Sequence, residues 1–184
     1  LELIDYRDTK GPFDKISSVG MYEHIGLDNI PAYFQTVRNL LKDDGLFMNH
    51  AISRGAKRKK KKFSSRPEQR ALQKYIFPGG YVPSLSEVSA SVEKTGLWAT
   101  DVEVLRGHYG PTLHHWRARF EAALPKVREM YDETFVRMWR FYLVACEATF
   151  EEMYQGVFRL PLAHRQDAVP VTRDYLSRGQ GDDR

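Results

Sequence analysis

Cysteine and long apolar runs are nearly absent from this chain. Cys146 is the single cysteine in 184 residues, which excludes an internal disulfide framework and a multi-cysteine zinc site and is typical of a reducing compartment. No uninterrupted apolar run reaches the roughly 18 residues of a membrane span. The first residues also lack the charged region, apolar stretch and small-residue cleavage site of a secretion signal. These features predict a cytoplasmic protein.

Hydrophobic side chains are plentiful enough for a core. They make up 42% of the residues, which excludes intrinsic disorder and, with this length, predicts one domain of ordinary size. The net charge of +4 is unevenly distributed: residues 54–70 hold nine Lys or Arg against one Glu, so the rest of the chain carries a net charge of −4. This basic insert predicts an anionic partner.

The stretch from Phe13 to Gly26 organises the chain. It reads FDKISSVGMYEHIG, which predicts a short buried strand that ends at Gly20 and is followed at once by Glu23 and His24. In open α/β sheets, ligands bind just outside the carboxyl ends of strands, so this Glu-His pair is a candidate site. Solvated charges at a strand end are the alternative.

A helix and a further strand follow. Apolar residues at helical spacing predict a crossover helix over 29–41, and LFMNHAI predicts a strand from Leu46 to Ile52 with His50 near its far end. Strand, helix and strand in this order predict a parallel pair. If the two strands are neighbours, Glu23 and His50 share one pocket.

The remaining pattern alternates short strands with helices. Ser84 and Glu87 form a capping box at the start of a helix that ends at Gly96, and Tyr109 follows the end of a later strand. The other expected elements are a strand at 1–4, a strand at 99–105, a helix from 112 broken at Pro125, a helix over 127–153, and a strand at 157–162. Residues 163–184 are polar and predict a frayed tail, so the expected domain is 1–162.

Six sequence strings carry a resemblance to a known family. In chain order they are DYRD, FDKISSVGMYEHIG, LFMNHAIS, KYIFPGGYVPS, HYGPTLHHW and YLVACEATF. Together they resemble the cyclopropane fatty acid synthase family, whose members are S-adenosylmethionine-dependent methyltransferases acting on unsaturated acyl chains of phospholipids or related lipids. The resemblance implies an α/β fold: the Rossmann-like sheet of a class I methyltransferase with helical insertions.

One feature of that family is missing. Its cofactor domain begins with a strand and a glycine-rich GxGxG loop, and nothing in this chain matches them, since Gly79-Gly80 lies in a turn-rich loop. By the resemblance, the chain is the carboxyl-terminal part of such an enzyme, with a sheet that lacks its first strands. We therefore expect the chain to be inert alone, and an unpaired edge strand at its start favours self-association as a homodimer.

The resemblance also implies roles for particular residues. It places Asp5, Tyr6, Val19 and Gly20 against S-adenosylmethionine. It assigns a bicarbonate ion, which serves as the general base, to a second group: Glu23, His50, Ile52 and Tyr109. Cys146 faces the same pocket, so the catalytic group is Glu23, His50, Tyr109 and Cys146. The implied partners are phospholipid acyl chains and an anionic membrane surface, contacted through Lys59, Lys60, Lys61 and Lys62 at its inner face.

Each assignment has a structural alternative. Tyr6 could be an ordinary strand-end aromatic, His50 a buried histidine with its hydrogen bonds satisfied, and Cys146 a small core residue on an apolar helical stripe. Adjacent His114 and His115 point to different helix faces, so no metal site is predicted. The alternative functions are an N-methyltransferase of the same superfamily and a basic membrane-binding module. Nucleic acid is disfavoured because the aromatics near the insert do not alternate with its charges.

Overall fold

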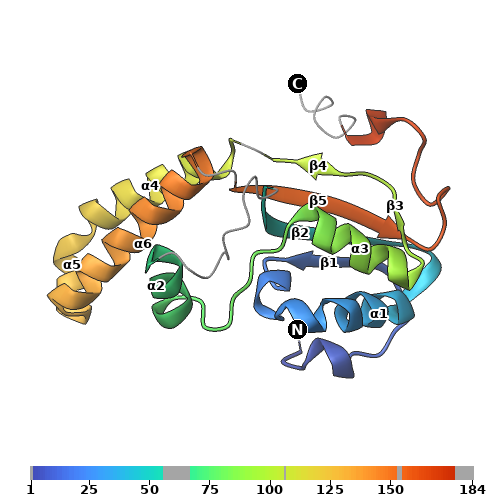
Figure 1. Ribbon diagram of the computed structural model, residues 1–184, viewed down its shortest axis with the longest axis horizontal. Coiled ribbons are helices and arrows are strands. Elements are labelled where there is room, and N and C mark those ends of the chain that lie inside the picture. The colour runs from blue at the N-terminus through green and yellow to red at the C-terminus, as the bar shows by residue number, and fades with distance from the viewer. Residues whose placement is uncertain (1, 56–66, 106, 153–154, 177–184) are drawn as a thin grey trace.

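The protein is described from a computed structural model that covers residues 2–55, 67–105, 107–152 and 155–176. A sheet with two helices packed against it forms the body, and a group of helices projects from one end (Figure 1). The strands are β1 (Phe13–Val19), β2 (Leu41–Arg54), β3 (Trp98–Ala99), β4 (Glu103–Val104) and β5 (Gln155–Ala163). The α-helices are α1 (Ile30–Leu40), α2 (Pro67–Tyr75), α3 (Leu85–Thr95), α4 (Tyr109–Ala122), α5 (Leu124–Met130) and α6 (Glu133–Glu152).

The sheet is mixed, with the order β1-β2-β5-β3 and β4 beside β3 on the same edge of β5. β1 and β2 are parallel, and their register sets Val19 opposite His50. β5 runs antiparallel to β2, with His50 opposite Arg159. The predicted parallel pair at Phe13–Val19 and Leu46–Ile52 is therefore confirmed, and its two carboxyl ends lie side by side.

The hydrophobic core lies between one face of this sheet and the pair α1 and α3. From Gly45 to Arg54, β2 alternates buried and half-buried residues, which is the pattern of a strand with unequal faces. Its buried Phe47 meets the rings of Tyr33 and Phe34 from α1 at centroid distances of 6.2 and 6.5 Å. The other buried core residues are Tyr22, Ile30, Val37, Leu41, Ala51, Val88, Val92, Leu97, Leu160 and Leu162.

The helix caps follow the sequence. Ser84 Oγ accepts the Glu87 N–H while the Glu87 carboxylate accepts the Ser84 N–H, so the predicted capping box is present. Gly96 ends α3 with a φ of 73°, in the left-handed region that favours glycine.

Several expected elements differ. The strand expected at 1–4 is wrong: Glu2–Ile4 have no strand structure, and Leu3 is fully exposed. Asp5 instead caps a 3-10 turn, η1 (Tyr6–Asp8), by accepting the Arg7 N–H. The strand expected at 99–105 is two short strands, β3 and β4, separated by residues 100–102.

The helices also begin and end at other residues than expected. The helix expected over 127–153 is divided into α5 and α6, because Asp132 Oδ1 accepts the Phe135 N–H and starts a new helix. Arg54, assigned to the surface insert, is the last residue of β2, and the expected insert 54–70 also runs into α2. Residues 56–66, which include the four lysines Lys59 to Lys62, lie outside the described residues.

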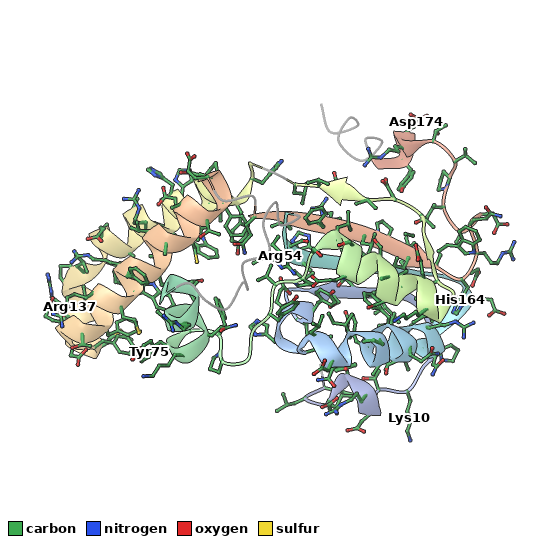
Figure 2. The ribbon with its side chains drawn as sticks, in the orientation of Figure 1. Lys10, Arg54, Tyr75, Arg137, His164 and Asp174 are labelled. Carbon is green, nitrogen blue, oxygen red and sulfur yellow. The ribbon has the colours of Figure 1, made fainter. Side chains whose placement is uncertain are left out.

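Within the described ranges, no helix has both the length and the apolar composition needed to cross a bilayer. Figure 2 shows the charged side chains of the projecting helices, with Arg137 at their far end. Ion pairs between the helices hold this arm together, among them Arg117–Glu147, Arg140–Glu121 and Arg128–Glu133.

Candidate active site

Glu23 lies directly beyond the carboxyl end of β1, in the 3-10 turn η2 (Tyr22–His24). Its side chain is only 7% exposed. One carboxylate oxygen, Oε1, accepts the N–H of Ile52 at 2.6 Å, which ties η2 to β2. The other oxygen, Oε2, is buried and has no hydrogen-bond partner among the residues that the structure describes. A buried, half-satisfied carboxylate is costly for stability, and such groups gather at functional sites.

His50 lies on β2, two residues before Ile52. It is close enough to Glu23 for the carboxylate to act on its charge. Its backbone carbonyl accepts the Gly20 N–H at 3.0 Å, which joins the ends of β1 and β2. Burial lowers the pKa of His50, and the positive charge of Arg159 on β5 lowers it further, while Glu23 and Glu103 act in the opposite direction. The net lowering keeps His50 neutral at pH 7, so its imidazole has one N–H to donate and one nitrogen to accept.

Tyr109 and Cys146 face the same region from the helical arm. Burial raises the pKa of Tyr109, and the nearby Cys146 and Glu23 raise it further. Burial raises the pKa of Cys146 to about 11. Tyr142, one turn before Cys146 on α6, has a pKa raised to about 12 by burial and then by Cys146 and Tyr109. The predicted catalytic group is thus brought together, with phenol and thiol both protonated at neutral pH.

Tyr109 is placed differently from the expectation. It is the first residue of α4 rather than part of a loop after a strand. Its ring lies 4.6 Å from that of Phe150 on α6 and 6.0 Å from that of Trp116 on its own helix, measured between centroids. Aromatic packing from two helices therefore holds the hydroxyl.

A line of rings forms one wall of the site. His24 lies 5.6 Å from Phe77, and Phe77 lies 5.9 Å from Tyr142, measured between ring centroids. The segment between α2 and α3 that carries Phe77 therefore connects η2 to α6. We expected that segment to be turn-rich, but no pattern in the sequence pointed to this contact.

Of the residues expected to bind the cofactor, Val19 and Gly20 lie at the carboxyl end of β1, and Asp5 and Tyr6 lie at the 3-10 turn η1 that precedes this strand in the chain. Val19 ends β1 and is 65% exposed. Gly20 has a φ of 67°, and apart from its two chain neighbours no described residue lies within 4 Å of the place where its Cβ would be, so the backbone there is open. Tyr6 packs edge-on against Tyr33 at 5.7 Å. Both carboxylate oxygens of Asp5 are bound by Arg7.

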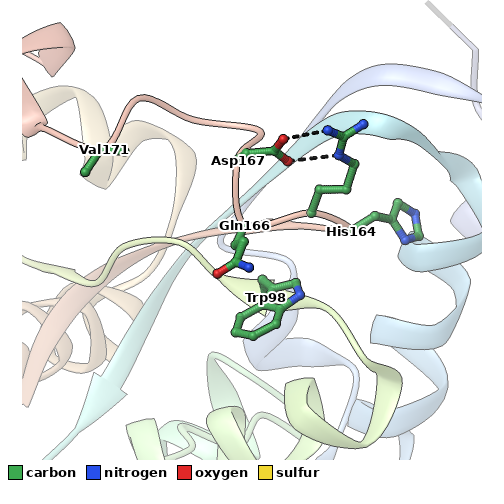
Figure 3. Close-up of a pocket in the computed structure, with 6 residues that line it drawn as sticks. Trp98, His164, Gln166, Asp167 and Val171 are labelled. Atoms are coloured by element: carbon green, nitrogen blue, oxygen red, sulfur yellow. Dashed lines mark hydrogen bonds and ion pairs between the residues drawn. The ribbon is translucent and has the colours of Figure 1, made fainter.

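A separate hollow lies away from these residues. Figure 3 shows it around Trp98 and Gln166, next to the ion pair of Arg165 with Asp167, at the end of β5 that pairs with the start of β2. His164 closes one side by bonding the carbonyls of Arg38 and Leu41. None of the predicted site residues lines it.

The fold matches that of class I methyltransferases: the cyclopropane synthase MmaA2 from Mycobacterium tuberculosis aligns with a TM-score of 0.80 and 25% identity over 86% of this chain and 57% of that chain. Mycolic acid cyclopropane synthase CmaA1 complexed with SAH and CTAB aligns with a TM-score of 0.78 and 26% identity, over 85% of this chain and 57% of that one.

Sequence similarity identifies the family. The profile "Mycolic acid cyclopropane synthetase" matches residues 1–160. A probable fatty acid methyltransferase of Pseudomonas putida is 38% identical over 97% of this chain and 46% of its own length. Cyclopropane-fatty-acyl-phospholipid synthase of Escherichia coli K12 is 38% identical over 85% of this chain and 40% of its own. The chain belongs to the mycolic acid cyclopropane synthetase family and spans less than half the length of these two relatives.

The thiol chemistry of Cys146 offers a first test of the site. A pKa of about 11 leaves very little thiolate at pH 8, whereas an unfolded cysteine has a pKa of about 8.5. We expect iodoacetamide to label the native protein on the order of 100-fold more slowly than the urea-unfolded protein. Since Cys146 is the single cysteine, mass spectrometry of the time course reads it directly. Equal rates would show an exposed, activated thiol instead.

Proposed function

We propose that this chain forms part of an S-adenosylmethionine-dependent enzyme that adds a one-carbon unit to the cis double bond of unsaturated acyl chains in phospholipids, giving a cyclopropane ring. The observation that carries the proposal is Glu23: a buried carboxylate whose Oε2 has no partner in the described part of the chain, near a neutral His50, at the edge of the sheet where ligands of such folds bind. The names of the two curated relatives support the same reaction class.

The residues present fit the small anion implied by the family resemblance. A second anion beside Glu23 would be repelled unless it donated a hydrogen bond, and bicarbonate carries one O–H for Glu23 Oε2. Its remaining oxygens would accept from the Tyr109 hydroxyl and the His50 N–H. Ile52 contributes through Glu23, because its N–H is already donated to Oε1. Bound there, bicarbonate would supply a general base.

The cofactor residues fit in part. Val19 and Gly20 present an open edge at the end of β1, and half-buried Tyr6 offers a ring. Asp5 is committed to Arg7, so any contact with the cofactor's ribose requires that pair to open. S-adenosylmethionine would supply an electrophilic methyl group at this edge.

The chain's own side chains have clear tasks in this chemistry. Adding a methyl group to an alkene leaves positive charge on the substrate carbon. The negative charge of Glu23 stabilises this positive charge where water is excluded, and the ring face of an aromatic such as Tyr142 contributes roughly 0.5 to 2 kcal/mol. Neutral His50 and protonated Tyr109 donate hydrogen bonds and orient the base without competing for its proton.

Two neighbouring proposals rest on less. The membrane contact through Lys59 to Lys62 depends on the sequence, since each Lys near an anionic surface contributes about 1 kcal/mol. The comparisons give no specific support for an N-methyltransferase role. The N-methyltransferase structures similar to this chain share 16% identity or less with it and show the fold alone.

The test is direct. The full product of the gene, given S-adenosylmethionine and vesicles of a cis-unsaturated anionic phospholipid, should yield acyl chains that have gained one CH2 and lost the double bond, as read by mass spectrometry. Pelleting the same vesicles with protein in which Lys59, Lys60, Lys61 and Lys62 are Gln should leave that variant in the supernatant. Unmodified acyl chains alongside a methylated amine headgroup would overturn the proposed reaction.

A further inference from the structure

Glu23 is held by two bonds, and both lead back to the end of β2. Its side chain accepts the Ile52 N–H. Its backbone carbonyl accepts the N–H of Tyr81 at 2.9 Å. Tyr81 lies in the long connection between α2 and α3, which has no regular structure of its own around this residue. Something else must therefore fix the position of Tyr81.

Arg54 supplies that attachment. Its guanidinium, on a side chain only 13% exposed, donates through Nη2 to the Tyr81 hydroxyl at 3.0 Å and through Nε to the Val82 carbonyl at 3.0 Å. Nη2 also contacts both carboxylate oxygens of Glu87, at 2.9 and 2.8 Å. The Tyr81 hydroxyl donates to Glu87 Oε1 at 2.7 Å, which closes a triangle of three side chains.

Neighbouring contacts reinforce the triangle. The backbone N–H of Arg54 and the hydroxyl of Ser53 both donate to the Pro83 carbonyl, at 3.1 and 2.8 Å. Burial alone would raise the pKa of Glu87, but hydrogen bonds from Ser84 and Tyr81 and the charge of Arg54 outweigh it and lower that pKa. Glu87 therefore stays ionised, and the triangle is charge-assisted.

We propose that Arg54, Tyr81 and Glu87 are positioning residues that hold Glu23 at the correct distance from His50. The triangle joins the start of α3 to β2 two residues beyond Ile52, so both attachments of Glu23 have one rigid strand as their base. Side chains that act on a reacting centre need such a supporting set, since a misplacement of about 1 Å is costly in rate. The catalytic role of Glu23 rests on the proposed function. The claim that the triangle fixes the position of Glu23 does not depend on that function.

The experiment separates placement from chemistry. Glu23, Glu103 and Arg159 are the charged groups that act on His50, and Glu23 raises its pKa. In the full product of the gene, the charge-neutral changes Tyr81→Phe and Arg54→Lys should let Glu23 move away. The His50 pKa, followed by NMR of the imidazole, should then fall in the direction that Glu23→Gln produces. Turnover at saturating substrate should fall about tenfold with little change in KM.

Arg140→Lys is the matched control, since Arg140 also binds both oxygens of one carboxylate, donating through Nε and Nη2 to Glu121 on the arm at 2.7 and 2.6 Å. It should leave both readouts unchanged. An unchanged His50 pKa in Tyr81→Phe and Arg54→Lys overturns the positioning role, whatever the activity. A lowered His50 pKa with unchanged turnover keeps the placement and contradicts the proposed role of Glu23 in the reaction.

Discussion

Glu23→Gln should lower turnover by a factor of about 10² to 10⁴, the range typical of losing a general acid-base group, with little change in cofactor affinity. The amide keeps an oxygen for the Ile52 N–H, now at Oε1, and so preserves the link between η2 and β2. It removes the negative charge and places an NH2 group where Oε2 now lies unpartnered. Single-turnover kinetics would read the chemical step, and calorimetry would read the binding of S-adenosylmethionine.

Glu147→Gln is the control for this change. Glu147 is 8% exposed, as buried as Glu23, but pairs with Arg117 and His114 between α4 and α6. Its substitution should cost stability and leave the chemical step within about threefold, because the carboxylate is paired within the arm. If Glu23→Gln weakens cofactor binding while turnover at saturation is unchanged, Glu23 belongs to the cofactor site, and its assignment to the site of the bicarbonate base is wrong.

Phe47→Ala should destabilise the fold by about 3 to 5 kcal/mol, the usual cost of emptying a buried aromatic position. Phe47 is fully buried on β2 and contacts the rings of Tyr33 and Phe34. Its removal leaves a cavity between the sheet and α1. Urea unfolding followed by circular dichroism gives the free energy of unfolding.

The same substitution at an exposed site removes as many side-chain atoms without emptying a core position. Phe141 on α6 is 49% exposed, so Phe141→Ala should change the free energy of unfolding by less than about 0.5 kcal/mol. A similar loss of unfolding free energy in the two variants would mean that Phe141 is also buried, and would contradict the core described between β2 and α1.

The sequence predicted those features that depend on local pattern. Alternation and helical spacing located β1, α1 and β2, and their order predicted the parallel pair that sets Glu23 beside His50. The capping box at Ser84 was readable for the same reason, since both partners lie within one helical turn. Because neighbouring parallel strands end at the same edge of a sheet, the strand order alone predicted that Glu23 and His50 lie in one region.

Features set by distant contacts were not predictable in this way. The position of β5 between β2 and β3 depends on pairing across about a hundred residues, and no local pattern records such a choice of neighbours. The sequence placed Arg54 at the start of the basic insert. In the structure its side chain is largely buried and pairs with Glu87, so it belongs to the triangle that positions Glu23. The division at Asp132 was hidden by apolar spacing that continues across both helices.

The central claim is that Glu23, His50 and Tyr109 hold a bicarbonate ion that acts as the base. The most direct measurement is the initial rate of CH2 incorporation by the full product of the gene in buffer freed of carbon dioxide, as bicarbonate is added back. The account predicts a low rate without the anion that rises to saturation, and a half-saturating concentration that increases in Tyr109→Phe. A rate independent of bicarbonate in the protein and in the Tyr109→Phe variant would contradict it.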